Sequence, residues 1–212
     1  MGKRFKREAE TMSKLSHTAI PECYAYVEAG DQIYMVLEYL EGKDLEAILQ
    51  ESEGFIPQED VIEWSVQVCD ALIHLHNQEP EPYVFRDVKP SNVTIGPDAQ
   101  VHLIDLGTVE AYQPGRELPN IGTEGYSPPE QYIGYSDVRS DVYALGATLH
   151  HLLTRRDPRK SSPFSFREAP PRALNPSISE ELEGVIIKAV EHNPEDRYQS
   201  VEEMKTALLT CL

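Results

Sequence analysis

A short polar stretch in the middle of the chain carries side chains suited to phosphate and metal chemistry. Arg86, Asp87, Lys89 and Asn92 fall within one segment, and Asp105 follows further along. Carboxylate and amide oxygens bind Mg²⁺, which proteins usually hold with one or two carboxylates plus substrate phosphates. A lysine supplies a compact positive charge for a phosphate oxygen, and a carboxylate that binds no metal can accept a hydroxyl proton. These residue types therefore indicate metal-assisted phosphate chemistry.

Two short strands joined by a turn are predicted to position these side chains. Gly96-Pro97-Asp98 provides the turn, and an alternating run, Val101-His102-Leu103-Ile104, follows it. Residues 83–107 are therefore predicted to form a β-hairpin with a polar loop at each end. The open ends of this hairpin would bring Asp87 and Asp105 together.

The same stretch resembles the catalytic loop and metal-binding segment of the eukaryotic-type (Hanks-type) Ser/Thr protein kinases found in bacteria. Kinases carry the signatures H-R-D-L-x-x-x-N, D-F-G and A-P-E in this order. Three motifs in register are far more specific than any one of them alone. The chain offers Phe85-Arg86-Asp87-Val88-Lys89-Pro90-Ser91-Asn92, Asp105-Leu106-Gly107 and Pro128-Pro129-Glu130.

The intervals between these motifs also match the family. Asp87 and Asn92 are five residues apart, Asn92 and Asp105 thirteen, and Asp105 and Glu130 twenty-five. The resemblance implies an α+β, protein-kinase-like fold, with a mostly helical C-lobe and a truncated N-lobe that holds a C-helix and two strands. It places the partial N-lobe at residues 1–37, the hinge at 38–42 and the C-lobe at 43–212.

The resemblance also implies an activity, which is ATP-dependent phosphoryl transfer to Ser or Thr of protein substrates with Mg²⁺. Asp87 would orient the substrate hydroxyl and accept its proton, and Lys89 would steady the γ-phosphate. Asn92 and Asp105 would hold Mg²⁺. Phe85 and Leu106 depart from the family's histidine and phenylalanine, but both are apolar and would pack beneath the site.

Two predicted strands, residues 23–28 and 32–37, lead into a stretch that resembles the hinge between the kinase lobes. Backbone groups of Glu38 and Leu40 would hydrogen-bond the adenine of ATP. Without the downstream motifs, an ordinary strand end would explain this stretch equally well. Thr94 stands where an apolar floor for the adenine is expected.

Residues 3–15 are predicted to form an amphipathic helix. Within it, Glu8 resembles the C-helix glutamate that pairs with a lysine of the third strand, although a solvated surface carboxylate is the simpler interpretation. The sequence contains neither that lysine nor a Gly-rich loop. The chain therefore resembles an N-terminally incomplete kinase and is expected to bind Mg-ATP weakly and transfer phosphate slowly or not at all. The alternative is a truncated pseudokinase or binding module without efficient catalysis.

Residues 108–130 resemble an activation segment, in which Thr123 would hydrogen-bond between Asp87 and Lys89. Arg86 would pair with a phosphate on this segment in many kinases. Residues 109–122 contain no Ser or Thr, so Glu110 is predicted to replace the phosphate. Two structural contacts are also implied by the resemblance: Glu130 with Arg197, and Asp141 with the backbone of the catalytic loop.

Helices are predicted at residues 57–77 and 137–153, because apolar residues recur there at helical spacing. His74 and His76 could suggest a metal site, but side chains two residues apart on a helix diverge. Residues 157–176 are predicted to form an exposed loop. Two closing helices would follow it, with Ser177 and Ser200 as their N-caps.

Composition limits the remaining possibilities. The chain has 212 residues, 40% of them hydrophobic, and a net charge of −17, which argues against a nucleic-acid-binding surface. Three widely spaced cysteines fit reduced thiols in a cytoplasmic protein better than a disulfide framework. No apolar run reaches the length of a membrane span. The sequence names no particular protein substrate and leaves the oligomeric state open.

Overall fold

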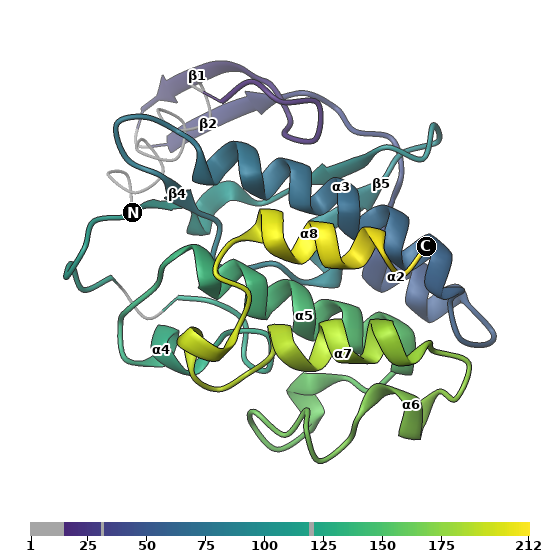
Figure 1. Ribbon diagram of the computed structural model, residues 1–212. Helices are drawn as coiled ribbons and strands as arrows, with labels where there is room; N and C mark the ends of the chain where they lie inside the picture. Colours follow the sequence, from purple (N-terminus) through teal and green to yellow (C-terminus); the bar gives the residue numbers. More distant parts are fainter. Residues whose placement is uncertain (1–14, 31, 119–120) are drawn as a thin grey trace.

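The computed structural model describes residues 15–30, 32–118 and 121–212 (Figure 1). A two-stranded sheet lies at one end of the molecule, and a larger body of helices forms the rest. Most of the buried apolar side chains belong to one continuous core within the helical body. Glu8 lies outside the described residues, and so does the predicted helix at 3–15 except for its last residue.

Strands β1 (Cys23–Ala29) and β2 (Gln32–Leu37) form the predicted antiparallel hairpin. Gly30 lies in the turn with a φ of 64°, a conformation that glycine adopts without steric cost. One strand pair cannot bury both of its faces, and several large apolar side chains of the hairpin are therefore exposed. They are Tyr24, Val27, Tyr34 and Val36.

This hairpin is expected to be the least stable part of the described fold, because an isolated two-stranded sheet is marginal in water. Hydrogen exchange measured by mass spectrometry should show residues 23–37 opening well before the long helices at 58–76 and 138–154. Equal protection of the hairpin and the two helices would show that the sheet is held more firmly than its exposed face indicates.

The core of the helical body is built by α3 (Gln58–His76), α5 (Val138–Thr154), α7 (Glu180–Ala189) and α8 (Val201–Leu209). Helix α5 lies at the centre and contacts the other three (Figure 1). Every residue of α5 from Ser140 onward is consequently buried. The two predicted long helices are confirmed to within one residue at each end.

The predicted single hairpin over residues 83–107 is wrong in its extent. The paired strands are β5 (Val93–Ile95) and β6 (Val101–Leu103), and β5 also pairs with β3 (Lys43–Asp44). The first part of the stretch, β4 (Tyr83–Val84), pairs instead with β7 (Glu110–Ala111). The chain leaves strand geometry between β4 and β5 because Arg86 has a φ of 73° and Pro90 has no amide hydrogen.

Short elements connect these parts. Helix α2 (Leu45–Glu51) is capped by Asp44, whose carboxylate accepts a hydrogen bond from the Ala47 amide. Two short α-helices lie on either side of α5 in the sequence. Helix α4 (Pro129–Tyr132) precedes it, and helix α6 (Pro171–Leu174) follows it. The 3₁₀ helices are η1 (Pro90–Asn92), η2 (Leu106–Thr108), η3 (Pro158–Lys160) and η4 (Pro194–Asp196).

Two predictions about the C-terminal third need correction. Residues 157–176 are not simply an exposed loop, because they contain η3 and α6 and bury Phe166 against α5. The N-cap of α7 is Ser179 rather than Ser177; its hydroxyl accepts from the Leu182 amide, whereas Ser177 bonds Asn175. The cap at Ser200 is confirmed.

Candidate active site

The backbone of the predicted catalytic loop, residues 85–92, is held by one buried carboxylate. Asp141, on α5, is fully buried and accepts hydrogen bonds from the backbone amides of Phe85 at 2.8 Å and Arg86 at 2.7 Å. His76, at the end of α3, donates to the same carboxylate through Nε2 at 2.8 Å. A buried charge is unfavourable unless it is hydrogen-bonded, and these three donors meet that need. The contact predicted for Asp141 is therefore present.

Three further side chains satisfy the carbonyl groups of the same loop. Buried backbone carbonyls require partners, and here they come from three separate elements, η2, α4 and α5. The sequence reasoning missed all three residues, although Gln131 directly follows the Pro-Pro-Glu motif. The bonds run from Thr108 to the Phe85 carbonyl at 2.9 Å, from Gln131 to that of Arg86 at 2.8 Å, and from Thr148 to that of Val88 at 3.2 Å.

The Asp87 carboxylate is the acceptor at the centre of the site. Lys89 Nζ donates to Asp87 Oδ2 and to Thr123 Oγ1, both at 2.7 Å. Thr123 Oγ1 in turn donates to Asp87 Oδ1 at 2.6 Å, so the hydroxyl lies between the two residues as predicted. Asn92 Nδ2 donates to the Asp87 carbonyl and to Oδ2. These contacts fix the direction of the carboxylate.

Asn92 and Asp105 are brought side by side through the backbone. The Ile104 amide donates to the Asn92 carbonyl at 2.9 Å, and the next residue, Asp105, is exposed. Asp105 has a left-handed backbone conformation, with φ 61° and ψ 67°. Such conformations cost about 1–3 kcal/mol and concentrate at functional sites. The backbone hydrogen bond between Ile104 and Asn92 therefore helps to hold Asp105 in a left-handed conformation that is unfavourable for a residue other than glycine.

The donor set at this point suits Mg²⁺. The Asn92 amide nitrogen is engaged by Asp87, which leaves its side-chain oxygen as the atom able to bind a cation. Over residues 15–30, 32–118 and 121–212, no group of three or more His, Cys, Asp or Glu side chains could hold a metal ion. A metal held by Asn92 and Asp105 would thus take its other ligands from phosphate and water, as Mg²⁺ commonly does.

A cavity of about 210 Å³ lies between the predicted hinge and the residues around Asp105. The Glu38 amide donates to the Glu22 carbonyl at 2.8 Å. Among the described residues, no backbone–backbone hydrogen bond involves the Glu38 carbonyl or the Leu40 amide. The lining residues are Pro21, Leu37, Glu38, Tyr39, Leu40, Ile104, Asp105 and Leu106.

The segment around Thr123 is shaped by two glycines. Gly122 has a φ of 147°, and a Cβ there would lie 2.2 Å from Gln131 Nε2 and from Ser127 Oγ. Gly125 has a φ of 88°, and a Cβ there would lie 2.7 Å from the backbone of Pro158. Larger residues at either position would displace the segment that carries Thr123.

The same segment is anchored to α5 by a buried hydrogen bond. Tyr126 and His151 lie 2.7 Å apart through the phenol oxygen and Nδ1. Burial raises the pKa of Tyr126 and lowers the pKa of His151, so a protonated phenol donates to a neutral imidazole.

Glu130 and Arg197 form the predicted buried ion pair. The two bonds measure 2.7 Å (Nη1 to Oε1) and 2.9 Å (Nη2 to Oε2), a bidentate geometry. Arg197 is 2% exposed, and its Nε donates to the Glu191 carbonyl. Its guanidinium also lies 4.8 Å from the centroid of the Tyr143 ring. The pair ties α4, at the end of the predicted activation segment, to the helical core.

The pairing of Arg86 with Glu110, which the sequence suggested, stays a prediction. Arg86 is buried, and Glu110 lies in β7, opposite Val84, which is two residues before Arg86.

The chain is similar to known kinases over nearly its whole length. The family model described as "Protein kinase domain" matches residues 1–209. Serine/threonine-protein kinase PknB of Mycobacterium tuberculosis is 37% identical over 224 residues, covering 97% of this chain and 35% of PknB. PknB of Mycobacterium leprae is 36% identical over 223 residues, covering 97% and 35%. The chain thus spans about a third of the length of these curated relatives.

Solved structures agree with the sequence comparison. The kinase domain of Mycobacterium tuberculosis PknI, determined as two double mutants, superposes with TM-scores of 0.74 and 0.77 at 26% and 27% identity. Each superposition covers 99% of this chain and 78% of the PknI chain. The described fold is therefore a protein-kinase-like fold.

Proposed function

Because the chain belongs to the protein kinase domain family, we propose that it transfers the γ-phosphate of ATP to Ser or Thr hydroxyls of protein substrates. The observation that carries this proposal is the Asp87 carboxylate, which Lys89, Thr123 and Asn92 hold in one orientation. A carboxylate fixed in this way can receive a hydroxyl proton without first reorganising. The lysine beside it matches the Ser/Thr class of relatives.

In the proposed reaction, the substrate hydroxyl donates a hydrogen bond to Asp87. Its oxygen forms a bond to the γ-phosphorus, the bond from that phosphorus to the ADP oxygen breaks, and the hydroxyl proton moves to the carboxylate. Lys89 contributes positive charge beside the transferring group, which spreads negative charge over three oxygens. Thr123 keeps Lys89 and Asp87 at fixed separation throughout the step.

We propose that the nucleotide binds in the cavity beside the predicted hinge and at the metal site formed by Asn92 and Asp105. The cavity next to Glu38 and Leu40 would take the adenine, whose edge matches one carbonyl and one amide of the backbone. Asn92 and Asp105 would hold Mg²⁺. When bound, this ion neutralises phosphate charge and orients the phosphates for transfer.

The proposal also covers the division of the chain into lobes and the setting in which it works. We propose that residues 1–37, 38–42 and 43–212 correspond to a partial N-lobe, a hinge and a C-lobe. Cys23, Cys69 and Cys211 are free thiols, which supports a reducing, cytoplasmic setting. None of the helices in the described ranges has the length and apolar character that crossing a lipid bilayer would require.

Asp105→Asn is expected to remove the Mg²⁺ dependence of nucleotide binding, because it deletes the one carboxylate proposed to hold the ion. Binding of a fluorescent ATP analogue is titrated with and without Mg²⁺, and phosphate transfer is measured on the same samples. Asp60→Asn, an exposed change in the first turn of α3, is the matched control. Mg²⁺-dependent binding that survives in Asp105→Asn would refute the assignment. Wild-type binding without any transfer would instead favour the binding-module alternative.

A further inference from the structure

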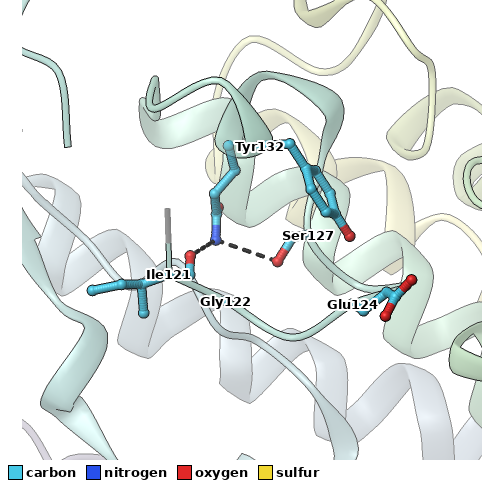
Figure 2. Close-up of a pocket in the computed structure, with 6 residues that line it drawn as sticks. Ile121, Gly122, Glu124, Ser127 and Tyr132 are labelled. Atoms are coloured by element: carbon cyan, nitrogen blue, oxygen red, sulfur yellow. Dashed lines mark hydrogen bonds between the residues drawn. The ribbon is translucent and has the colours of Figure 1, made fainter. Parts of the chain in front are cut away.

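A second cavity adjoins the proposed phospho-acceptor position. It has a volume of about 310 Å³ and lies beside the segment that contains Thr123 (Figure 2). Gly122 and Glu124 both line it, and the residue between them, Thr123, bonds directly to Asp87. A peptide whose hydroxyl reached Asp87 would therefore have its neighbouring residues close to this cavity.

One buried side chain, Gln131, joins the wall of the cavity to the catalytic loop. Gln131 is 2% exposed, and its Nε2 donates to the carbonyls of Arg86 and Ile121 and to Ser127 Oγ. Figure 2 shows two of these bonds, those to Ile121 and Ser127. One side-chain amide thus fixes the cavity wall and the catalytic loop together.

The charge of the cavity comes from Glu124. Among its described lining residues, Glu124 is the one with a charged side chain, and it is exposed. No ion pair with Glu124 exists within the described ranges. The nearby Arg159 is already committed, since it pairs with Asp157 and Glu46 at 2.8 Å each. A ligand cation would therefore meet an uncompensated carboxylate.

An aromatic face stands beside this carboxylate. Figure 2 shows the Tyr132 ring and the Glu124 carboxylate on the same side of the cavity. The Tyr132 ring meets Phe164 edge-on, with centroids 5.7 Å apart, and Phe164 meets His192 in the same manner at 5.7 Å. Phe164 has a left-handed φ of 59°. Burial, followed by the Glu124 charge, raises the pKa of Tyr132, so its phenol stays protonated.

We infer that Glu124 and Tyr132 select protein substrates with a basic side chain, preferably arginine, close to the phospho-acceptor residue; this inference rests on the proposed function. A guanidinium can bond a carboxylate and stack on an aromatic face at the same time, which an ammonium does less well. The net charge of −17 adds a long-range attraction for basic segments. A carboxylate and a phenol ring around one cavity would disfavour an acidic side chain at the same position.

Peptide binding tests the inference without any need for turnover. Fluorescein-labelled peptides carry one central Ser, with Arg, Gln or Glu placed at each flanking position in turn. Binding to the full chain is followed by fluorescence anisotropy in the absence of ATP. When Arg occupies the one flanking position that reaches the cavity, the peptide should bind about tenfold more tightly than the matching Gln peptide. This difference is what a modest ion pair and a cation–π contact together would contribute.

Charge exchange separates recognition from a structural effect. Glu124→Gln should remove the preference for Arg, and Glu124→Lys should reverse it, so that the Glu peptide binds more tightly. Glu53→Gln removes the same charge from an exposed site after α2 and should leave the preference intact. Equal binding of the Arg, Gln and Glu peptides to the wild type, or an unchanged preference in Glu124→Gln, would overturn the inference.

The two proposals fail in different ways. An Arg preference without phosphate transfer would remove the proposed kinase activity and keep the recognition site. Transfer to Ser or Thr peptides with no Arg preference would support the kinase activity and overturn the recognition site.

Discussion

Asp87→Asn should lower the rate of phosphate transfer by about 10²–10⁴-fold, the contribution typical of a positioned general base. Asparagine has nearly the same shape and can still accept one hydrogen bond from Lys89 or Thr123, but it cannot take up the hydroxyl proton. Lys89 is partly exposed, so water can solvate the charge that loses its partner. The variant should therefore remain folded.

The rate is measured with labelled ATP and a Ser/Thr protein substrate, and folding is checked by circular dichroism. Asp60→Asn serves as the control for loss of one carboxylate at an exposed position. Equal rates for wild type and Asp87→Asn would exclude Asp87 as the base. An unfolded Asp87→Asn protein would show that the carboxylate is chiefly structural.

Asp141→Ala should destabilise the protein by about 3–5 kcal/mol. The substitution leaves the amides of Phe85 and Arg86 and the His76 ring without their common acceptor, and each buried unsatisfied donor costs about 1–3 kcal/mol. Because two of these donors belong to the catalytic loop, transfer activity should fall as well.

Urea unfolding of wild type and variant gives the difference in the free energy of unfolding. Asp141→Asn keeps the size and one acceptor oxygen, so it should lie between the wild type and Asp141→Ala. Asp60→Ala, at an exposed position, should change stability little. A loss below about 1 kcal/mol for Asp141→Ala would contradict a central role of this carboxylate in holding the loop.

The parts of the site that could be predicted from sequence are those set by short motifs. Asp87, Lys89 and Thr123 lie in direct hydrogen-bond contact, although Thr123 is distant in sequence. The Glu130–Arg197 pair was also predictable, because each residue lies in a recognisable stretch. Such contacts follow from the family resemblance rather than from periodicity or composition.

The residues that the sequence did not indicate act on the backbone of the loop, either directly or through Asp141. Gln131 and Thr148 donate to loop carbonyls, and any polar side chain at the right place could do so. His76 was predicted only as a helix-end residue, yet it bonds Asp141 from 65 positions away. Sequence spacing carries no signal for hydrogen bonds between a side chain and a group that is distant in the chain.

Short strands were predicted less well than long helices. The pairing of β4 with β7, and of β3 with β5, involves two residues in each strand. Segments this short have no detectable periodicity, and tertiary packing decides their partners. The long helices α3 and α5 were predictable because several turns of apolar residues repeat along one face.

Transfer of labelled γ-phosphate from ATP to Ser or Thr is the measurement that decides whether this fold acts as a protein kinase. Wild type and Asp87→Asn are compared at high enzyme concentration, both as this chain and as the full-length product of its gene. Mass spectrometry identifies the modified residue. Mg²⁺-dependent phosphoserine or phosphothreonine that forms with the wild type and not with Asp87→Asn is the expected result. No phosphorylated residue with either form of the wild type, or equal amounts with Asp87→Asn, would contradict the proposed function.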